Sequence, residues 1–524
     1  YKDGVMLNNS NVKIGGIHFR GVDSRVFNVT KYGNGEFVYV NSGEGLYKRG
    51  DLTVDGCDII KGTGQLVRVD GFPGQTVAED SLFLRNVTIK DNRYYSDSEN
   101  NDTGSQGRFL RIDGAMVDTV MIVDNEYYSE PGGIIRSTDA LVGLLNYNDY
   151  SHTFIKHLEM SGNKATGFRD VLFSKMYGPI KNILIDNNIF KEFESILYLI
   201  SVDKSGANYT ELDTIRVNNI LLKDNQFENM SHLHRIDRMW VDEFESIGNK
   251  YIGSNYGVRY YSSIFTPQKF TTMTFEDDLF QSVGFADTDP PEILNSRVTD
   301  LISFQGAEFS QLPVDKWNDM SARRAKYSNQ LTQWVGPYVP SVGFGDRDYN
   351  ADFRPDVVFD GVRLIGDVAS GDKIINMNDS LYLTIRNSFF DLGSINESQP
   401  IYVKYPNPFK FINNYVEVDE MTSANLVYIA SPYVAGADTI YYFGNTLVNY
   451  GGITGRPLDV QNINGLTWFV GDNKSTGWTL PNRYYQSSGN INPVWHNEFY
   501  LMGEDNVIYR INVNGGTITA TINY

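Results

Sequence analysis

The stretch ILIDNNIF, residues 183–190, contains the pattern that decides the fold of this chain. It reads as a short apolar strand, a polar bend at two Asn residues, and an aromatic residue that starts a second strand. Strands with one buried face are built from alternating positions, and Asn is one of the residues that tight bends favour. The stretch therefore predicts two short strands joined by a sharp turn.

The same unit recurs along the chain. Its clearest other copies are VTIKDNRY (residues 87–94), VMIVDNEY (120–127) and ILLKDNQF (220–227), and weaker copies begin at Leu158, Phe244, Met273, Phe409, Ile440 and Trp468. When the copies are aligned, the sixth position is always Asn or Asp: Asn92, Asn125, Asn163, Asn188, Asn225, Asn249, Asp278, Asn414, Asn445 and Asn473.

Four further copies, which begin at Val12, Leu52, Val357 and Leu383, carry Gly or Asn one position earlier, at Gly16, Gly56, Gly361 and Asn387. Asn and Gly enter the left-handed backbone region at low cost, so we expect the Asn or Gly of each copy to form the bend. Bends that stack on one another would also let Asn amides hydrogen-bond along the stack.

The interval between copies is irregular, from 24 residues between Asn225 and Asn249 to 38 between Asn125 and Asn163. A β-propeller or a leucine-rich repeat holds its period more tightly, whereas a β-helix accepts loops of any length at its corners. The repeat therefore predicts an all-β, right-handed parallel β-helix with three short strands in each coil. A β-sandwich of alternating strands is the alternative.

The repeat is interrupted once, between Asp278 and Val357. We expect a first β-helical part over residues 1–300, a loop and helix insertion over 301–355, and a continuation with a C-terminal cap over 356–524. A short helix is predicted at about residues 314–331, lying across the coil. Two stacked β-helical halves are the alternative, because the Gly-type copy recurs just after the break.

Composition excludes several classes of protein. The 524-residue chain has 45 Lys and Arg against 64 Asp and Glu, a formal charge of −19, which repels nucleic acid and anionic membrane surfaces. The single Cys57 excludes an intrachain disulfide framework and a zinc cluster, and no apolar run is long enough for a membrane helix. Tyr1 is not a natural start, so any signal peptide or lipid anchor is expected outside this sequence.

The strand, Asn bend and aromatic unit resembles the coils of the pectin lyase-like superfamily, and most closely the β-helical surface lipoproteins of glycan-degrading bacteria. The resemblance implies an exported protein, secreted or held at a bacterial outer membrane, that binds a polysaccharide and cleaves it if it is a lyase or a hydrolase. A non-enzymatic surface adhesin or glycan-binding component of an outer-membrane assembly, and a phage tailspike depolymerase, are the alternatives. The resemblance is architectural and transfers no mechanism.

A lyase needs a base and a cation that neutralises a uronate carboxylate. The segment SHLHRIDRMW, residues 231–240, concentrates such groups and predicts a basic pocket with an aromatic floor. A salt-bridged loop that covers the coil is the alternative. The candidate catalytic residues are His232, His234, Arg235, Asp237 and Arg238, with Trp240 as the aromatic floor.

The insertion supplies candidate sugar-binding residues, because exposed aromatic rings pack against sugar rings. These are Trp317, Trp334 and Tyr338, with Arg323 and Arg324 beside them. The same aromatic side chains would serve equally well to attach the insertion to the solenoid.

The segment DRDYNAD offers alternating oxygen ligands, Asp346, Asp348, Asn350 and Asp352, as at the start of an EF-hand loop. Ala351 replaces the turn Gly and Val357 stands where a bidentate Glu belongs. Calcium is therefore the one cofactor that we consider, in a structural site.

Asp277 and Asp278 resemble the carboxylate pair of a glycosidase. They align, however, with Asn187 and Asn188 of the repeat, which predicts a place in the bend rather than in catalysis.

Overall fold

The computed structural model describes residues 5–7, 12–15, 18–20, 27–30, 40–41, 46–47, 50–62, 66–70, 82–96, 109–113, 115–129, 140–145, 154–167, 170–176, 180–201, 216–237, 240–261, 269–283, 299–327, 342–344, 356–368, 373–396, 399–422, 425–430, 439–451, 455–461, 467–471, 473–478, 483–484, 498–502, 508–514 and 517–523. The chain divides into two compact units. The first comprises Tyr1–Thr271, Ser296–Val298 and Asp315–Trp334, and the second comprises Thr272–Asn295, Thr299–Val314 and Val335–Tyr524.

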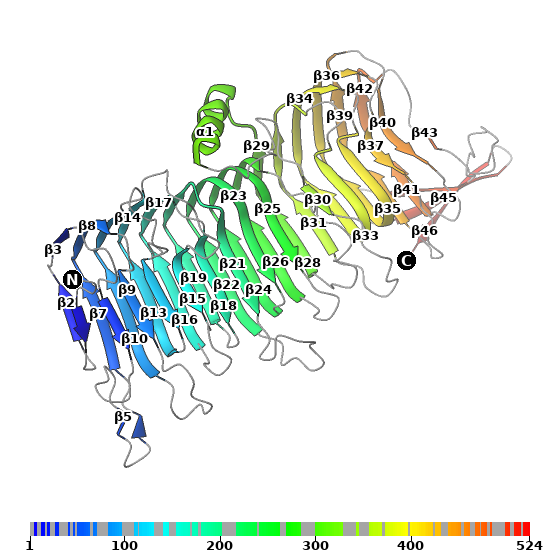
Figure 1. The fold of residues 1–524 in the computed structure, drawn as a ribbon. Coiled ribbons are helices and arrows are strands. Elements are labelled where there is room, and N and C mark those ends of the chain that lie inside the picture. Colours follow the sequence, from blue (N-terminus) through cyan, green and yellow to red (C-terminus); the bar gives the residue numbers. More distant parts are fainter. Residues whose placement is uncertain are drawn as a thin grey trace. The chain divides into compact units, whose positions relative to one another are not determined.

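The first unit is built from two groups of parallel strands, and within each group the strands lie side by side along the unit (Figure 1). The strands that precede the bend of each copy are β2 (Val12–Gly15), β7 (Gly50–Asp55), β10 (Leu82–Lys90), β13 (Ala115–Val123), β16 (Phe154–Ser161), β19 (Ile180–Asp186), β22 (Arg216–Lys223) and β24 (Trp240–Ile247).

The other strands of the first unit are β1 (Val5–Leu7), β3 (His18–Arg20), β4 (Phe27–Thr30), β8 (Asp58–Gly62), β9 (Val67–Asp70), β11 (Arg93–Ser96), β12 (Leu110–Asp113), β14 (Glu126–Ser129), β15 (Ala140–Leu145), β17 (Lys164–Thr166), β18 (Asp170–Met176), β20 (Ile189–Lys191), β21 (Ser195–Ser201), β23 (Gln226–Asp237) and β25 (Lys250–Tyr261). A short antiparallel pair, β5 (Val40–Asn41) and β6 (Leu46–Tyr47), stands apart from them.

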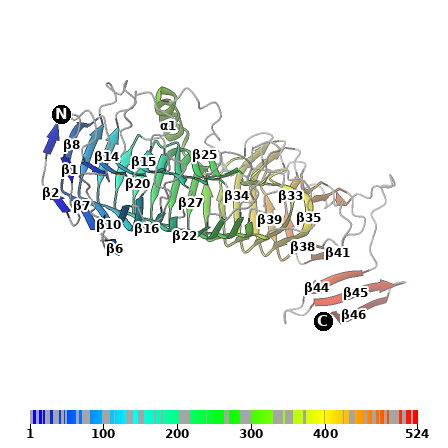
Figure 2. The same cartoon turned by 60° about the horizontal axis from the view of Figure 1, so that its bottom comes forward.

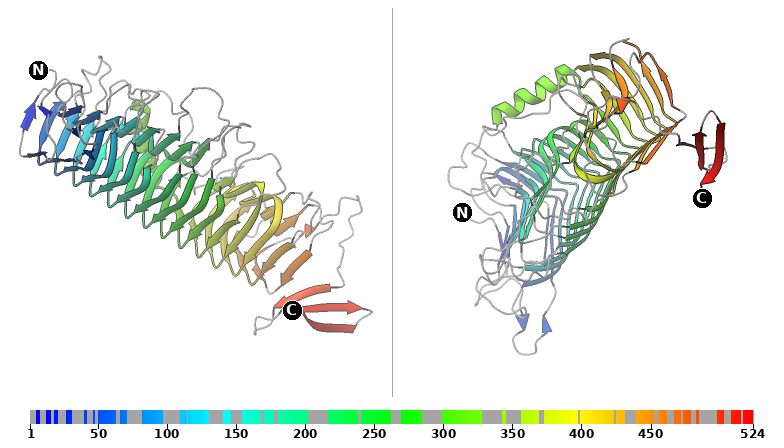
Figure 3. Two further views of the ribbon diagram at one scale, coloured as in Figure 1. Left: turned by 90° about the horizontal axis from the view of Figure 1, so that it is seen from below. Right: turned by 90° about the vertical axis from the view of Figure 1, so that its right-hand side faces the viewer.

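The second unit repeats this arrangement (Figure 2). Its strands are β26 (Lys269–Glu276), which begins in the first unit, β27 (Leu279–Val283), β28 (Thr299–Gln305), β29 (Glu308–Ser310), β30 (Val342–Phe344), β31 (Asp356–Asp360), β32 (Arg363–Ile365), β33 (Ile375–Arg386), β34 (Phe389–Asn396), β35 (Ile401–Ile412), β36 (Tyr415–Thr422), β37 (Asn425–Ile429), β38 (Thr439–Phe443), β39 (Thr446–Asn449), β40 (Arg456–Val460), β41 (Thr467–Gly471), β42 (Lys474–Thr476) and β43 (Arg483–Tyr484). The last three strands, β44 (Glu498–Met502), β45 (Ile508–Asn514) and β46 (Thr517–Asn523), form a separate antiparallel sheet (Figure 3).

The strands pair in the register that the repeat predicts. In β16 and β19, for example, Leu158 lies beside Ile183 and Met160 beside Ile185, and all four side chains are buried. The aromatic residue of each copy also points inward, and the Phe227 ring stacks on that of Tyr251 with centroids 5.2 Å apart. Equivalent residues thus form rows through the interior, so the all-β parallel β-helix predicted from the repeat is confirmed.

The bend differs from the expectation in one respect. The left-handed residue is the fifth of each copy, whether that is Asp, Asn or Gly: Asp91, Asp124, Gly162, Asn187, Asp224, Gly248, Asp277, Gly306, Gly361, Asn387, Asn413 and Gly444 all have φ between 52° and 69°. The prediction was right for Gly56, Gly361 and Asn387 but wrong for the Asn at the sixth position. That Asn follows the bend, and both types of copy share one geometry.

The sixth residue has a different role, because its side chain is buried. Asn163 is 2% exposed, and its Oδ1 accepts from both the backbone N–H and the side-chain amide of Asn125, at 3.0 and 2.9 Å. Its own amide donates to the carbonyl oxygens of Ile122 and Ser161 and to Asn188. Each Asn therefore joins three consecutive coils, as we expected from stacked amides.

The stretch 299–310, part of which we placed in an insertion, is a further copy of the repeat. β28 pairs with β31 and β29 pairs with β32, and Gly306 forms the bend between β28 and β29 with φ 62°. Only after Ser310 does the chain leave the coil, to form α1 (Val314–Tyr327), which agrees with the helix predicted at this position. Figure 2 shows α1 outside the stacked strands.

Candidate functional site

His234 is a core residue, which corrects the prediction that it belongs to a catalytic pocket. Its side chain is fully buried on β23, edge-on to the ring of Phe244 at 5.1 Å and to that of Tyr251 at 6.5 Å. Burial lowers the pKa of His234 to about 3, so the imidazole is neutral near pH 7. A side chain enclosed in this way cannot contact a polysaccharide.

The other residues of the predicted pocket have no described side chains. The backbone of His232, Arg235 and Asp237 lies in β23, opposite Tyr256, Arg259 and Tyr261 of β25. Arg238 lies outside the described residues. Of the five candidate catalytic residues, His234 is therefore the one whose side chain the structure describes. No pairing of a base with a cation is seen among the described side chains of this group.

Trp240 lies on the outer side of the first unit and is half-buried. The guanidinium carbon of Arg216 is 5.8 Å from the centre of its ring, within the range of a cation–π contact. The Arg216 Nε also lies 2.7 Å from Asp242 Oδ2. Trp240 thus belongs to a charged surface group rather than to the floor of a described pocket.

Trp317 was predicted to bind sugar, but on α1 it is only 7% exposed. The alternative, that it attaches the helix to the rest of the protein, fits this burial better. Arg323 and Arg324 follow on α1 without described side chains, and Trp334, Tyr338, Asp346, Asp348, Asn350 and Asp352 lie outside the described residues. The calcium expectation thus remains a prediction.

Asp277 and Asp278 belong to the bend, as their alignment predicts. Asp277 is its left-handed residue with φ 52°, and Asp278 is 1% exposed. The backbone N–H of Glu308, in the next coil, donates to the carbonyl oxygen of Asp278 at 2.8 Å. The two adjacent aspartates therefore occupy the bend of the repeat, as their alignment with Asn187 and Asn188 predicted.

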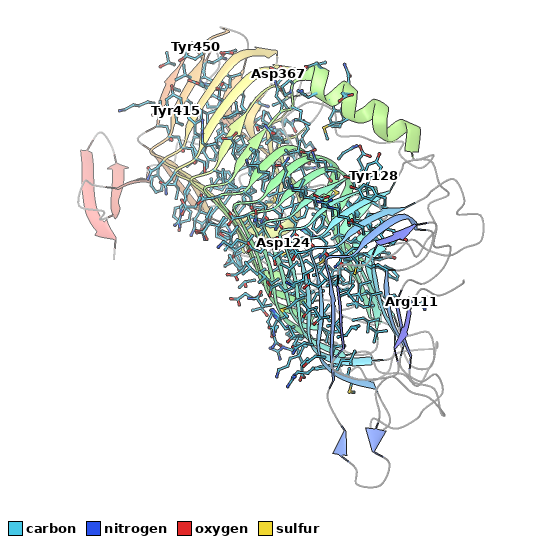
Figure 4. All side chains as sticks on the ribbon, turned by 90° about the vertical axis from the view of Figure 1, so that its left-hand side faces the viewer. Arg111, Asp124, Tyr128, Asp367, Tyr415 and Tyr450 are labelled. Atoms are coloured by element: carbon cyan, nitrogen blue, oxygen red, sulfur yellow. The ribbon has the colours of Figure 1, made fainter. Side chains whose placement is uncertain are left out.

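An aromatic surface that we did not predict lies on the second unit, where β34, β36 and β39 place Phe389, Tyr415 and Tyr450. The rings of Phe389 and Tyr415 stack with centroids 5.5 Å apart and planes inclined by 13°. Tyr450, just after β39, is 64% exposed (Figure 4). We call these three residues the tyrosine platform.

A carboxylate lies at the edge of the tyrosine platform. The Tyr415 hydroxyl donates to Glu417 Oε2 at 3.1 Å, and this hydrogen bond is the main reason that the pKa of Tyr415 is raised. The nearby Tyr450 hydroxyl raises it further. The platform thus combines partly exposed aromatic rings with hydroxyl and carboxylate groups, a combination suited to a polyhydroxylated ligand.

A smaller aromatic pair lies on the first unit. Tyr95 of β11 and Tyr128 of β14 are 41% and 43% exposed, and their ring centroids are 6.4 Å apart with planes inclined by 51°. The two rings are thus tilted rather than stacked. Arg93 and Glu126 pair beside them, with Nε and Oε2 3.5 Å apart.

Several outward-facing charges of both units pair from one coil to the next. Arg386 pairs with Asp360 at 2.7 Å, and Arg85 pairs with Asp51. The hydrogen bond from Arg85 is the largest of the effects that lower the pKa of Asp51. These pairs are exposed, so each contributes little to stability.

The sequence matches no protein-family model, and neither curated proteins nor solved structures give a significant match to this chain. No helix of the described residues has the length and apolar character needed to span a membrane. The fold is therefore established by the structure itself, and the pectin lyase-like family remains a prediction from the repeat.

Proposed function

We propose that this protein is an exported glycan-binding β-helix of the pectin lyase-like kind, which holds a polysaccharide on the outer surface of its second unit. The tyrosine platform supports this proposal most directly, because two partly buried stacked rings and a third, exposed ring bring aromatic side chains of neighbouring coils together at the surface. Secretion or attachment to a bacterial cell surface is part of the same proposal.

The geometry of the fold favours an extended ligand. Phe389 and Tyr415 occupy equivalent positions in adjacent coils, so their rings are spaced by the distance between neighbouring strands. A polymer of sugar rings that lies along the stack would meet the outward edge of one aromatic ring after another. Stacking against such rings depends on apolar contact, while Glu417 and the two hydroxyl groups are placed to bind sugar hydroxyls.

The proposal favours binding over cleavage for one reason. The platform contributes aromatic rings and a carboxylate, whereas the residue of the predicted catalytic group whose side chain is described, His234, is enclosed in the core. Release of unsaturated or reducing products from a polysaccharide by the purified protein would show that binding is not its whole function.

The test is a binding screen against neutral and acidic polysaccharides, followed by calorimetry with the best ligand. Tyr450→Ala is expected to weaken binding about tenfold, the loss expected when a well-packed aromatic contact is removed. Tyr128→Ala removes an exposed tyrosine of the first unit and is the matched control. Equal loss in both variants, or none in Tyr450→Ala, would show that the platform is not the binding site.

A further inference from the structure

Two carboxylates lie beside the stacked rings of the tyrosine platform. Phe389 and Tyr415 are neighbours in β34 and β36, and Asp391 and Glu417 follow them by two residues on the same strands, directly opposite each other in the register. Side chains two apart in a strand point to the same side of the sheet, so the carboxylates share the outward side with the rings, and both are partly exposed. We call Asp391 and Glu417 the acidic row.

The carboxylates of the acidic row have no cationic partner among the described side chains. The Asp391 carboxylate makes no hydrogen bond or ion pair there, and Glu417 accepts one hydrogen bond, from the Tyr415 hydroxyl at 3.1 Å. Neighbouring strands lie about 4.8 Å apart, so the two negative charges face each other across one strand spacing. Like charges in this position repel each other and destabilise the sheet.

Two other pairs of outward charges in the second unit show the opposite arrangement. Arg386 lies opposite Asp360 in the register and pairs with it at 2.7 Å. Arg363 lies opposite Glu308 and pairs with it at 3.3 Å. In both pairs a cation of one coil neutralises an acid of the preceding coil, whereas the acidic row places two acids in register. The acidic row therefore weakens the fold locally, which is typical of residues that serve binding.

The other described charges near the platform leave it negative. Asp419 is exposed and lies two residues beyond Glu417, so it extends the negative charge along β36. Arg363, in the coil before Phe389, is engaged by a glutamate. Lys474 lies in the same row as Tyr415 but two coils further on, about 10 Å away at the usual strand spacing. A ligand on the platform therefore meets carboxylates first.

We propose that the tyrosine platform selects a glycan without acidic groups, whose hydroxyl or ammonium groups donate hydrogen bonds to Asp391 and Glu417. An ionised carboxylate is an acceptor only, so the sugar must bring the hydrogen, and a hydrogen bond to a charged acceptor is stronger than one between neutral groups. A uronate or a sulfate ester at the same place is repelled. The inference rests on the proposed function, because it takes the platform to be the binding surface, and it adds the charge class of the ligand.

The test compares three oligosaccharides of equal length by calorimetry: one neutral, one with free amino groups and one of uronic acids. A chelator is present, so that no divalent cation bridges the uronic acids to the acidic row. The uronic acid ligand is expected to bind about tenfold more weakly than the neutral one, and the difference should shrink at high salt. Tighter binding of the amino sugar would assign the acidic row to an ammonium group, and equal binding would assign it to hydroxyl groups.

Two variants test the acidic row itself. Glu417→Gln removes one charge and keeps an acceptor for the Tyr415 hydroxyl, and Asp391→Asn removes the other charge. Each is expected to reduce the discrimination against the uronic acid ligand to about threefold, which is half of the tenfold difference in free energy. Asp356→Asn is the matched control, because Asp356 is an exposed acid of β31, in the other group of strands, and its loss changes the net charge equally. It should leave the discrimination unchanged.

The inference would be overturned if wild-type protein bound the uronic acid ligand as tightly as the neutral one. It would also be overturned if Glu417→Gln and Asp391→Asn discriminated as strongly as wild-type protein. Both results would leave glycan binding intact. The proposed function fails separately, if no glycan binds or if Tyr450→Ala has no effect.

Discussion

The two units form the same bend but differ in the residue that follows it, at the sixth position of each copy. In the first unit, Asn occupies the sixth position of six copies, from Asn92 to Asn249, and their amides form an unbroken row of hydrogen bonds. In the second unit the sixth residues are Asp278, Ala307, Val362 and Ser388 before the row resumes at Asn414. All of these copies keep a left-handed residue at the fifth position.

The comparison separates two requirements. The left-handed fifth residue is present in every copy whose bend the structure describes, so the turn itself depends on it. The buried amide is present in some copies and replaced by a carboxylate, a small or an apolar side chain in others, so it adds stability without defining the path of the chain. The predictions below follow from this division.

The largest effect is expected for Asn188→Ala in the middle of the first row. Asn188 Oδ1 accepts from the backbone and side chain of Asn163 at 2.9 Å, and its amide donates to three further groups. Because several buried polar groups lose their partners together, we expect a loss of about 4 kcal/mol in the free energy of unfolding, measured by urea denaturation.

The control for this variant is Asn187→Ala, at the exposed left-handed position with φ 54°. It should cost about 1 kcal/mol, the strain of placing Ala in that conformation. If the two variants were equally destabilised, the buried row would not be the stronger of the two features.

Acid is expected to act on the first unit through His234, whose pKa falls from an ordinary 6.5 to about 3 on burial. The unfolded chain then binds a proton that the folded chain does not, so stability is complete above pH 6.5 and declines as pH falls toward 3. At pH 4 the loss amounts to about 3 kcal/mol.

His234→Phe tests this expectation, because Phe cannot be protonated and suits the aromatic surroundings of Phe244 and Tyr251. The difference in unfolding free energy between pH 7 and pH 4 should be about 3 kcal/mol smaller in the variant than in wild-type protein. An identical pH dependence in the two proteins would mean that folding does not lower the pKa of His234.

A smaller effect is expected at two bends of the second unit that have nearly the same backbone. Gly306 and Gly361 have φ of 62° and 65°, but a Cβ at Gly306 would lie 2.3 Å from Asp277 Oδ1, whereas at Gly361 it would meet nothing closer than 4.0 Å. Gly361→Ala should cost about 1 kcal/mol from backbone strain, and Gly306→Ala about 2 kcal/mol because the Asp277 carboxylate must also move.

The double variant Asp277→Gly/Gly306→Ala isolates the steric part. Removal of the Asp277 side chain should reduce the cost of Gly306→Ala to about that of Gly361→Ala, about 1 kcal/mol, in a double-mutant cycle. No interaction between the two substitutions would show that the carboxylate moves aside freely.

The repeat predicted much of the fold because alternation and the polar bend have simple physical causes. It missed the copy at residues 302–309 because Ala307 carries no amide at the sixth position, although Gly306 matches the Gly-type copies. Assigning the bend to the sixth residue was an error for a related reason: Asn favours both left-handed backbone and buried hydrogen-bonded sites, and sequence alone does not separate the two.

The candidate site was harder to predict than the fold. His234 was taken for a surface residue because it stands among charged residues, yet it is two residues from Ile236 and shares its inward side. The tyrosine platform depends on the seventh position of each copy, which faces outward and differs from copy to copy, as at Phe389 and Tyr415. A position that does not repeat gives no signal until the coils are stacked.

The smallest predicted effect extends the row of amides in the second unit. Ser388 is 2% exposed; its N–H already donates to Asn414 Oδ1 at 3.0 Å, and its Oγ accepts from the Val362 N–H at 3.3 Å. Ser388→Asn would place an amide where the other coils have one, with the carbonyl oxygens of Phe359 and Arg386 as acceptors by analogy with Asn125. We expect a gain of about 1 kcal/mol in the free energy of unfolding, since each added buried hydrogen bond contributes about this amount. A loss of stability would instead mean that the row ends before Ser388 because the neighbouring Val362 coil leaves no space for a larger side chain.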